Sequence, residues 1–160
     1  MFVDKINCKG KFRIFTRQVG EQDWNLVLEQ TNLVVNTGRK LIKDLLLGIE
    51  TGIVIQSFAF GTGDTAPTLS DTELESAVEY STGNTYKAFE EYEVLTDTSV
   101  MFTGYYNSLQ PTTQPVDLVE IGLFTGVEAT AGIMYCRSTF DAITKTINLE
   151  LKLEYTLEWN

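Results

Sequence analysis

The chain has 160 residues, 43% of them hydrophobic and 21% charged, and its 12 basic and 22 acidic residues give a net charge of −10. This length and composition predict a single globular domain, residues 1–160, because a chain of this size buries a sizeable apolar core. The acidic balance argues against a nucleic-acid partner, since such binding requires Lys and Arg to neutralise phosphates.

The absence of histidine excludes further classes of function. Without histidine there is no Ser–His–Asp or Cys–His nucleophile system and no His-ligated metal. No apolar run approaches the roughly 18–20 residues of a membrane span, and the first residues lack the basic and apolar regions of a signal peptide. Cys8 and Cys136 are too few and too far apart for a disulfide scaffold or a zinc site. We therefore expect no membrane association, no cofactor and no metal.

Strand signals begin near the N-terminus. Residues 11–15 and 24–28 are rich in apolar side chains and are joined by the polar stretch 18–23, which predicts a hairpin. Residues 1–29 could also form an interaction arm that adds a strand to a neighbouring subunit. In that interpretation the candidate interaction residues of this segment are Phe12, Ile14 and Trp24.

One helix is predicted at about 38–47, with Thr37 as its cap and Gly48 as its stop. Its apolar face is expected to contain Leu41, Ile42, Leu45 and Leu46, with Arg39, Lys40, Lys43 and Asp44 facing away. A second helical turn is expected at about 71–77, where Ser70 and Glu73 have the spacing of a capping box.

The remaining elements are short strands separated by turn residues. They are expected at 53–60, 86–95, 100–106, 116–124 and 133–140. Residues 147–159 alternate strictly between apolar and polar side chains, which predicts one long strand with a single buried face. Together these elements predict a mainly β protein, an antiparallel β-sandwich with one helix.

Three segments contain residue types that catalyse reactions or bind ions in other proteins. The acidic residues of the loop 64–75 could hold Ca²⁺, but their spacing matches no EF-hand and a solvated loop is favoured. The carboxylates of Glu90, Glu91 and Glu93 are better explained as a charged strand edge than as an acid–base pair. Residues 61–65 lack the Gly-Lys-Ser/Thr ending of a phosphate loop, which favours a turn. We therefore assign no catalytic residue.

The tyrosines offer one further surface. Tyr105 and Tyr106 precede a polar stretch that resembles a loop tip, so one of the two is expected to face outward. With Tyr86 and Tyr92 they could line a carbohydrate-binding face, although aromatic residues also suit strands and cores.

Three phrases resemble small structural proteins of tailed-bacteriophage virions. Residues 32–42 read Asn-Leu-Val-Val-Asn-Thr-Gly-Arg-Lys-Leu-Ile, as in the start of such proteins, where a similar phrase leads into a helix. Residues 58–75 contain Gly-Thr-Gly-Asp-Thr-Ala-Pro and then Asp-Thr-Glu-Leu-Glu, which is similar to the most specific signature of this group. Residues 119–124, Val-Glu-Ile-Gly-Leu-Phe, are similar to their later strand.

The resemblance implies a non-enzymatic structural subunit in the tail region, such as a collar, baseplate or fibre attachment. It implies a location in the virion after synthesis in the host cytoplasm, with other virion proteins and copies of the chain itself as partners. The alternatives are a capsid decoration or head-fibre protein, a carbohydrate-binding receptor module and, last, an enzyme. Position alone suggests that Glu120, within the third phrase, faces outward or is buried beside Arg39 or Lys40.

Overall fold

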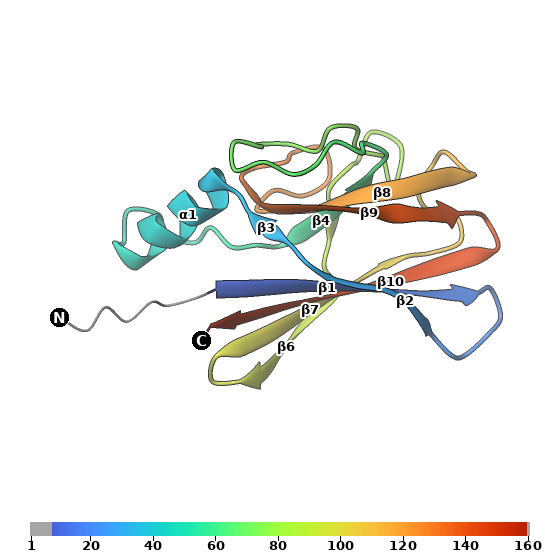
Figure 1. The fold of residues 1–160 in the computed structure, drawn as a ribbon, viewed down its shortest axis with the longest axis horizontal. Helices are drawn as coiled ribbons and strands as arrows, with labels where there is room; N and C mark the ends of the chain where they lie inside the picture. The colour runs from blue at the N-terminus through green and yellow to red at the C-terminus, as the bar shows by residue number, and fades with distance from the viewer. Residues whose placement is uncertain (1–7, 160) are drawn as a thin grey trace.

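The computed structural model describes residues 8–159, which form two antiparallel sheets packed face to face and one helix (Figure 1). The mainly β, antiparallel sandwich predicted from the sequence is therefore confirmed. The elements in chain order are β1 (Cys8–Gln18), β2 (Asn25–Thr31), β3 (Leu33–Val34), α1 (Asn36–Leu46), β4 (Ser57–Gly61), β5 (Lys87–Ala88), β6 (Glu91–Thr96), β7 (Ser99–Tyr106), β8 (Val116–Phe124), β9 (Met134–Lys145) and β10 (Leu149–Trp159).

The two sheets differ in how their edges are built. The first has the strand order β2-β1-β10-β7-β6 and the second β3-β9-β8-β4-β5. Two-residue strands, β3 and β5, form the edges of the second sheet, whereas β2 and β6 give the first sheet edges of seven and six residues. A short edge strand offers few unpaired backbone groups, so the first sheet is the one open to strand addition.

The alternation in the last strand positions its apolar side chains in the core. Leu151, Leu153 and Tyr155 are at most 1% exposed, as expected for a strand with one face against a second sheet. Strand β1 pairs with β10 over its whole length, so that Phe12 lies opposite Tyr155 and Ile14 opposite Leu153. The two inner faces together form one continuous core.

The N-terminal hairpin is present, but it is not a separate arm. Strand β1 is bonded to β2 on one side and to β10 on the other, so it is an inner strand of the sheet. Phe12 and Ile14 are both 0% exposed. Contrary to the prediction, these two side chains stabilise the core and cannot form an exposed contact surface. Residues 1–7 of the predicted arm lie outside the described residues.

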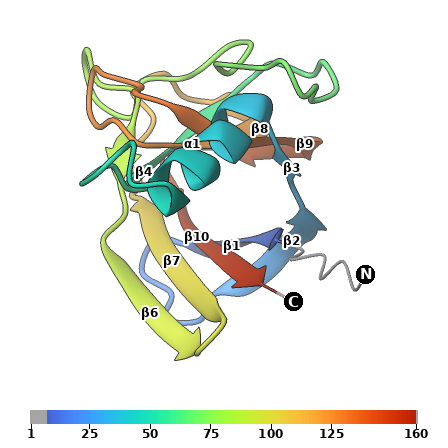
Figure 2. The ribbon, with the colours of Figure 1, turned by 90° about the vertical axis from the view of Figure 1, so that its left-hand side faces the viewer.

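Helix α1 differs from the prediction in its cap and in its buried face. Its N-cap is Val35, without a side-chain cap, and the Thr37 hydroxyl donates to the carbonyl of Met134 instead. Asp44, expected to face solvent, is buried and ion-paired with Lys40 and Lys43. In Figure 1 the helix extends to the left of the ends of the strands, and Figure 2 views the molecule from that side. The apolar side chains of its last turn are consequently exposed.

The second helical turn predicted at 71–77 is wrong, because this segment has no helix. Its backbone groups bond to distant partners: the N–H groups of Glu75 and Ser76 donate to the Glu120 carboxylate, and the Ser76 carbonyl accepts from Thr62. The side chain of Asp71 binds Thr68 rather than starting a helix. A helix needs those same N–H groups for its own turns.

Candidate functional site

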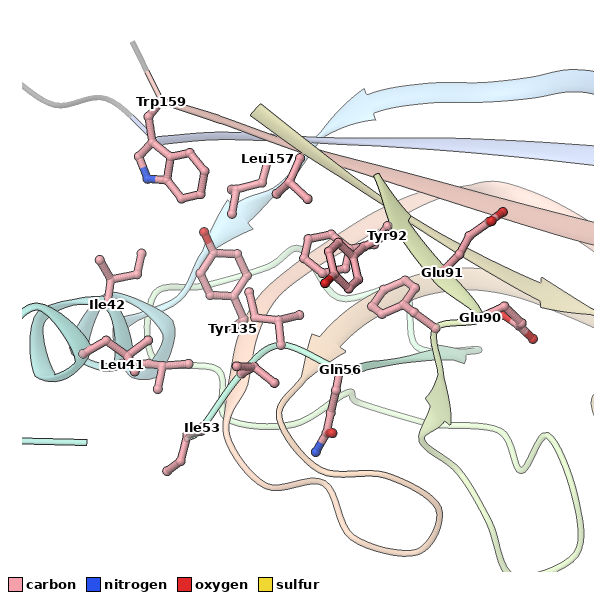
Figure 3. A pocket seen from close by; sticks show the side chains of 16 residues that line it. Leu41, Ile42, Ile53, Gln56, Glu90, Glu91, Tyr92, Tyr135, Leu157 and Trp159 are labelled. Carbon is pink, nitrogen blue, oxygen red and sulfur yellow. The ribbon is translucent and has the colours of Figure 1, made fainter. Parts of the chain in front are cut away.

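An apolar groove opens at one end of the sandwich, between the two sheets and beside α1. Its volume is about 790 Å³. Figure 3 shows its side chains converging from α1, the segment 53–56, β6, β7, β9 and the end of β10. The lining residues are Leu41, Ile42, Leu45, Ile53, Val54, Ile55, Gln56, Phe89, Glu90, Glu91, Tyr92, Val100, Phe102, Tyr135, Leu157 and Trp159.

The register of the first sheet explains why the walls are apolar. Tyr92 lies opposite Phe102 and Val94 opposite Val100 in the β6–β7 pair, so these side chains share the inner face of the sheet. In the part of the chain that the structure describes, the second sheet has no strand opposite them at this end: residues 53–56 run alongside as extended chain that belongs to no strand. A continuous apolar face therefore lines a space that no second layer of these residues fills.

Few polar atoms of the groove are free to act chemically. The Gln56 amide donates to the Thr125 carbonyl. The Tyr135 hydroxyl lies 3.4 Å from the Cys8 sulfur, and burial raises its pKa, which keeps the phenol neutral at ordinary pH. Glu90 is ion-paired with Lys87 and accepts from the backbone of Tyr105. Such walls suit the binding of apolar surface rather than acid–base or nucleophilic chemistry.

Exposed apolar side chains also lie at the rim of the groove and around it. Leu46 is 82% exposed and Ile49 is 63% exposed at the end of the helix. Across the opening Tyr92 is 72% and Val94 67% exposed on β6. Single exposed apolar residues are ordinary, but a group of them around one groove marks an interaction surface. We call this group, together with the groove walls, the apolar end.

A second notable site is a buried polar cluster on the second sheet. The Glu120 carboxylate is 0% exposed and accepts from the N–H groups of Gly63 (3.1 Å), Glu75 (3.1 Å) and Ser76 (2.8 Å). It also accepts from Nε of Arg137 at 2.9 Å, with Nη2 at 2.8 Å. Of the two predicted placements the buried one is correct, but the partner is Arg137 rather than Arg39 or Lys40.

The acidic loop is engaged by the same arginine. Asp71 lies 2.8 Å and Glu75 3.7 Å from the Arg137 guanidinium. Burial opposes the charge on Arg137, but the hydrogen bonds that Arg137 donates to Asp71 and Glu120 raise its pKa above the ordinary value. Within residues 8–159 no group of three or more His, Cys, Asp or Glu side chains could hold a metal ion. The arrangement fastens the loop 61–76 onto β8 and β9.

Glycine is required where this loop meets the cluster. A Cβ on Gly61 would lie 2.4 Å from Oε1 of Glu120, and one on Gly63 would lie 2.8 Å from the same atom. Neither glycine has a positive φ. These glycines are therefore required for close approach to the carboxylate, and not for a left-handed backbone in the turn predicted at 61–65.

The predicted aromatic surface is largely dispersed. Tyr106 is 1% exposed and belongs to the core, so its prediction as an interaction residue is wrong, whereas Tyr105 is half-buried and faces outward. Tyr105 packs against Trp24 with ring centroids 5.9 Å apart. The Arg17 guanidinium lies over the Trp24 ring at 4.3 Å. Tyr86 packs on Phe124 instead, so the tyrosines do not form one carbohydrate-binding face.

The groove itself was not predicted, although two sequence signals point to it. The apolar run Leu45-Leu46-Leu47-Gly48-Ile49 is wider than one helix face requires, and Tyr92 and Val94 alternate with Glu91 and Glu93, which predicts an apolar face on this strand. Comparisons of the chain with protein-family models, curated proteins and solved structures found no match. No helix among residues 8–159 is long and apolar enough to cross a membrane.

Proposed function

We propose that this protein is a structural subunit of a tailed-bacteriophage virion, associated with the tail as part of a collar, baseplate or fibre attachment. It acts by assembly with other virion proteins rather than by catalysis. The observation that carries the proposal is the apolar end: a groove of about 790 Å³ with exposed Leu46, Ile49, Tyr92 and Val94 around it. Surfaces of this kind on a protein in water are stabilised when a partner covers them.

The resemblance to virion proteins supports the same reading from a different part of the chain. Gly61, Gly63, Asp71, Glu75 and Glu120 all lie within the phrases that resemble this group. In the fold these residues meet around the buried Glu120–Arg137 ion pair. The phrases thus correspond to a physical unit of this fold, the fastened loop.

Charge and topology also suit an assembly subunit. A net charge of −10 keeps a protein soluble at a high copy number. Repeated subunits associate through symmetric or head-to-tail interfaces, so we expect a homo-oligomer. A capsid decoration or head-fibre protein is the nearest alternative; it would detach from virions without release of the genome, whereas loss of a tail component would leave incomplete particles.

The carbohydrate-binding alternative depends on Trp24 and Tyr105, the two predicted interaction residues that lie outside the core and pack against each other. A sugar ring stacks on an open aromatic face, but one face of Trp24 is occupied by Arg17. This alternative predicts binding on a glycan array that a Trp24→Ala variant loses. If the protein binds no glycan on the array, the carbohydrate-binding alternative is excluded.

The test of the proposal is quantitative mass spectrometry of purified virions from the phage whose genome encodes the chain. A virion subunit is present at a fixed number of copies relative to the major capsid protein, before and after a high-salt wash. Its absence from the particles would overturn the proposal. Light scattering after size exclusion then gives the mass of the purified protein, where a ring-sized oligomer identifies self-assembly and a monomer identifies an adaptor that orders on other virion proteins.

A further inference from the structure

We infer that the apolar end binds an extended segment of another protein, added as a new strand at the free edge of β6, with Lys or Arg at alternate positions opposite Glu91 and Glu93. The inference deepens the proposed function, on which it rests for the identity of the partner as a virion protein. The chemistry of the partner segment follows from β6 itself: its free edge, its alternating faces and its charge.

The first step is the free edge. Strand β6 is the last strand of its sheet, bonded to β7 on one side only. Within residues 8–159, one row of its backbone N–H and C=O groups therefore has no neighbouring strand, and such a row can bind an extended peptide by main-chain hydrogen bonds. The adjoining groove supplies pockets for every second side chain of that peptide.

The second step is the alternation of β6. Tyr92 and Val94 lie on the face that continues the groove wall, whereas Glu91 and Glu93 lie on the opposite face. Figure 3 shows the Tyr92 ring in the groove and the Glu91 carboxylate directed away from it. A strand added beside β6 repeats this division, so its side chains are apolar on the groove side and polar on the other.

The third step is charge. Among the described residues, neither Glu91 nor Glu93 makes a salt bridge. Opposite charges on neighbouring strands stabilise a pair and like charges destabilise it. Pairing of β6 with β6 of a second copy would set these glutamates against one another, which disfavours a second copy and favours a basic partner segment.

The fourth step distinguishes a polypeptide from a small apolar ligand. The volume of the groove falls within the range of small-molecule sites. A small molecule inside it, however, would leave Val94 and Leu46 in water, at 67% and 82% exposure. A strand along β6 covers Val94 as well as filling the groove, so it accounts for more of the exposed apolar surface.

The experiment uses the full chain with the substitution Trp24→Phe, which leaves Trp159, in the groove wall, as the single tryptophan. The probe is a nine-residue peptide that alternates lysine and valine, with blocked ends. We expect a saturable shift of tryptophan emission to shorter wavelength as the peptide covers Trp159. A peptide with proline at its central valine lacks one main-chain donor and is expected to bind more weakly.

Charge reversal provides the decisive comparison. Reversing two attractive cross-strand charges with Glu91→Lys and Glu93→Lys should weaken binding of the lysine peptide by about tenfold. The same variant should bind a glutamate–valine peptide better than the lysine peptide. The matched control is Asp23→Lys with Glu73→Lys, two exposed carboxylates outside the groove, which should leave the affinity unchanged.

Three outcomes would overturn the inference. They are the absence of a saturable change, an affinity that is the same in the Glu91/Glu93 variant as in the control, and displacement of the peptide by dodecanoate together with indifference to the central proline. The proposed function fails separately: peptide binding with the expected charge dependence, in a protein that is absent from virions, supports strand addition and refutes the virion role. A protein that is present in virions but does not bind the peptide supports the virion role and refutes strand addition.

Discussion

Replacement of Glu120 by glutamine tests whether the buried cluster holds the second sheet and its long loop together. Oε1 accepts from Gly63 and Ser76, while Oε2 accepts from Glu75 and Arg137. Glutamine keeps the shape of the side chain but replaces one oxygen by an amide donor. Whichever oxygen is replaced, two donors lose their acceptor, and the Arg137 guanidinium loses its fully buried counter-charge.

The expected loss is large for a protein of this size. Each buried donor left without an acceptor costs about 1–3 kcal/mol, so two cost about 2–6 kcal/mol. Removal of one member of a buried ion pair costs about 3–5 kcal/mol, which agrees with that sum. At about 2–4 °C per kcal/mol, the melting temperature should fall by roughly 6–20 °C.

The assay is urea denaturation followed by tryptophan fluorescence and circular dichroism, with coincident transitions as the two-state criterion. The control is Glu29→Gln, because Glu29 is 47% exposed in its pairs with Lys11 and Arg13, and such pairs contribute about 0–1 kcal/mol. In a cycle with Arg137→Met the two losses should be non-additive by more than about 1 kcal/mol. A Glu120→Gln variant as stable as the Glu29 control would refute this account of the cluster.

Three further outcomes follow from single positions. A Cβ at Gly38 would lie 2.1 Å from the backbone oxygen of Tyr135. Although replacing glycine by alanine ordinarily stabilises a helix, Gly38→Ala should therefore lower the free energy of unfolding by about 1–3 kcal/mol. Thermal melting shows whether the variant is less or more stable than the native protein. Burial lowers the pKa of Lys145 to about 8, against about 10.4 in the unfolded chain. Between those values the unfolded state binds more protons, so the stability of the native protein relative to Lys145→Met should rise with pH in denaturation curves at pH 7.5, 9 and 10.5. Cys136 is fully buried and burial raises its thiol pKa, so iodoacetamide should alkylate it only after unfolding, as mass spectrometry of native and denatured samples would show.

The parts of the fold that the sequence predicts well are those governed by local pattern. The alternation of apolar and polar residues over 147–159 requires one buried face and one solvent-facing face, and β10 has both in the structure. The spacing of the N-terminal hairpin likewise places β1 beside β2. In both segments neighbouring residues along the chain carry the whole signal, so no knowledge of distant contacts is needed.

The incorrect predictions concern segments whose structure depends on contacts with residues far away in the chain. The segment 71–77 has local helix signals, but its N–H groups are taken by Glu120, which lies over forty residues away in the chain. The partner of Glu120 follows from the β8–β9 register, which places Gly122 opposite Arg137. The strands were predicted, but their register was not, so the arginine that completes the cluster could not be identified.

The groove was missed for a related reason. The helix face of Leu41, Ile42, Leu45 and Leu46 was expected to be buried, but the outer part of that face extends past the sheets, and Leu46 is 82% exposed. An apolar stripe predicts that something covers it, whether that cover comes from the same chain or from another. Sequence periodicity alone does not distinguish the two cases.

The buried polar cluster and the apolar end have different physical roles and are built from different segments of the chain. The buried cluster consists, apart from Arg137 and Ser76, of residues within the phrases that resemble virion proteins, and it determines how the loop 61–76 is fixed. The apolar end takes most of its exposed residues from segments 45–55 and 91–95, outside those phrases. Since Leu46, Ile49, Tyr92 and Val94 are exposed, substitution of these residues costs little folding free energy. In the proposed role, the exposed residues that select a partner are therefore separate from the residues that hold the fold, and the choice of partner can change while the sandwich stays the same.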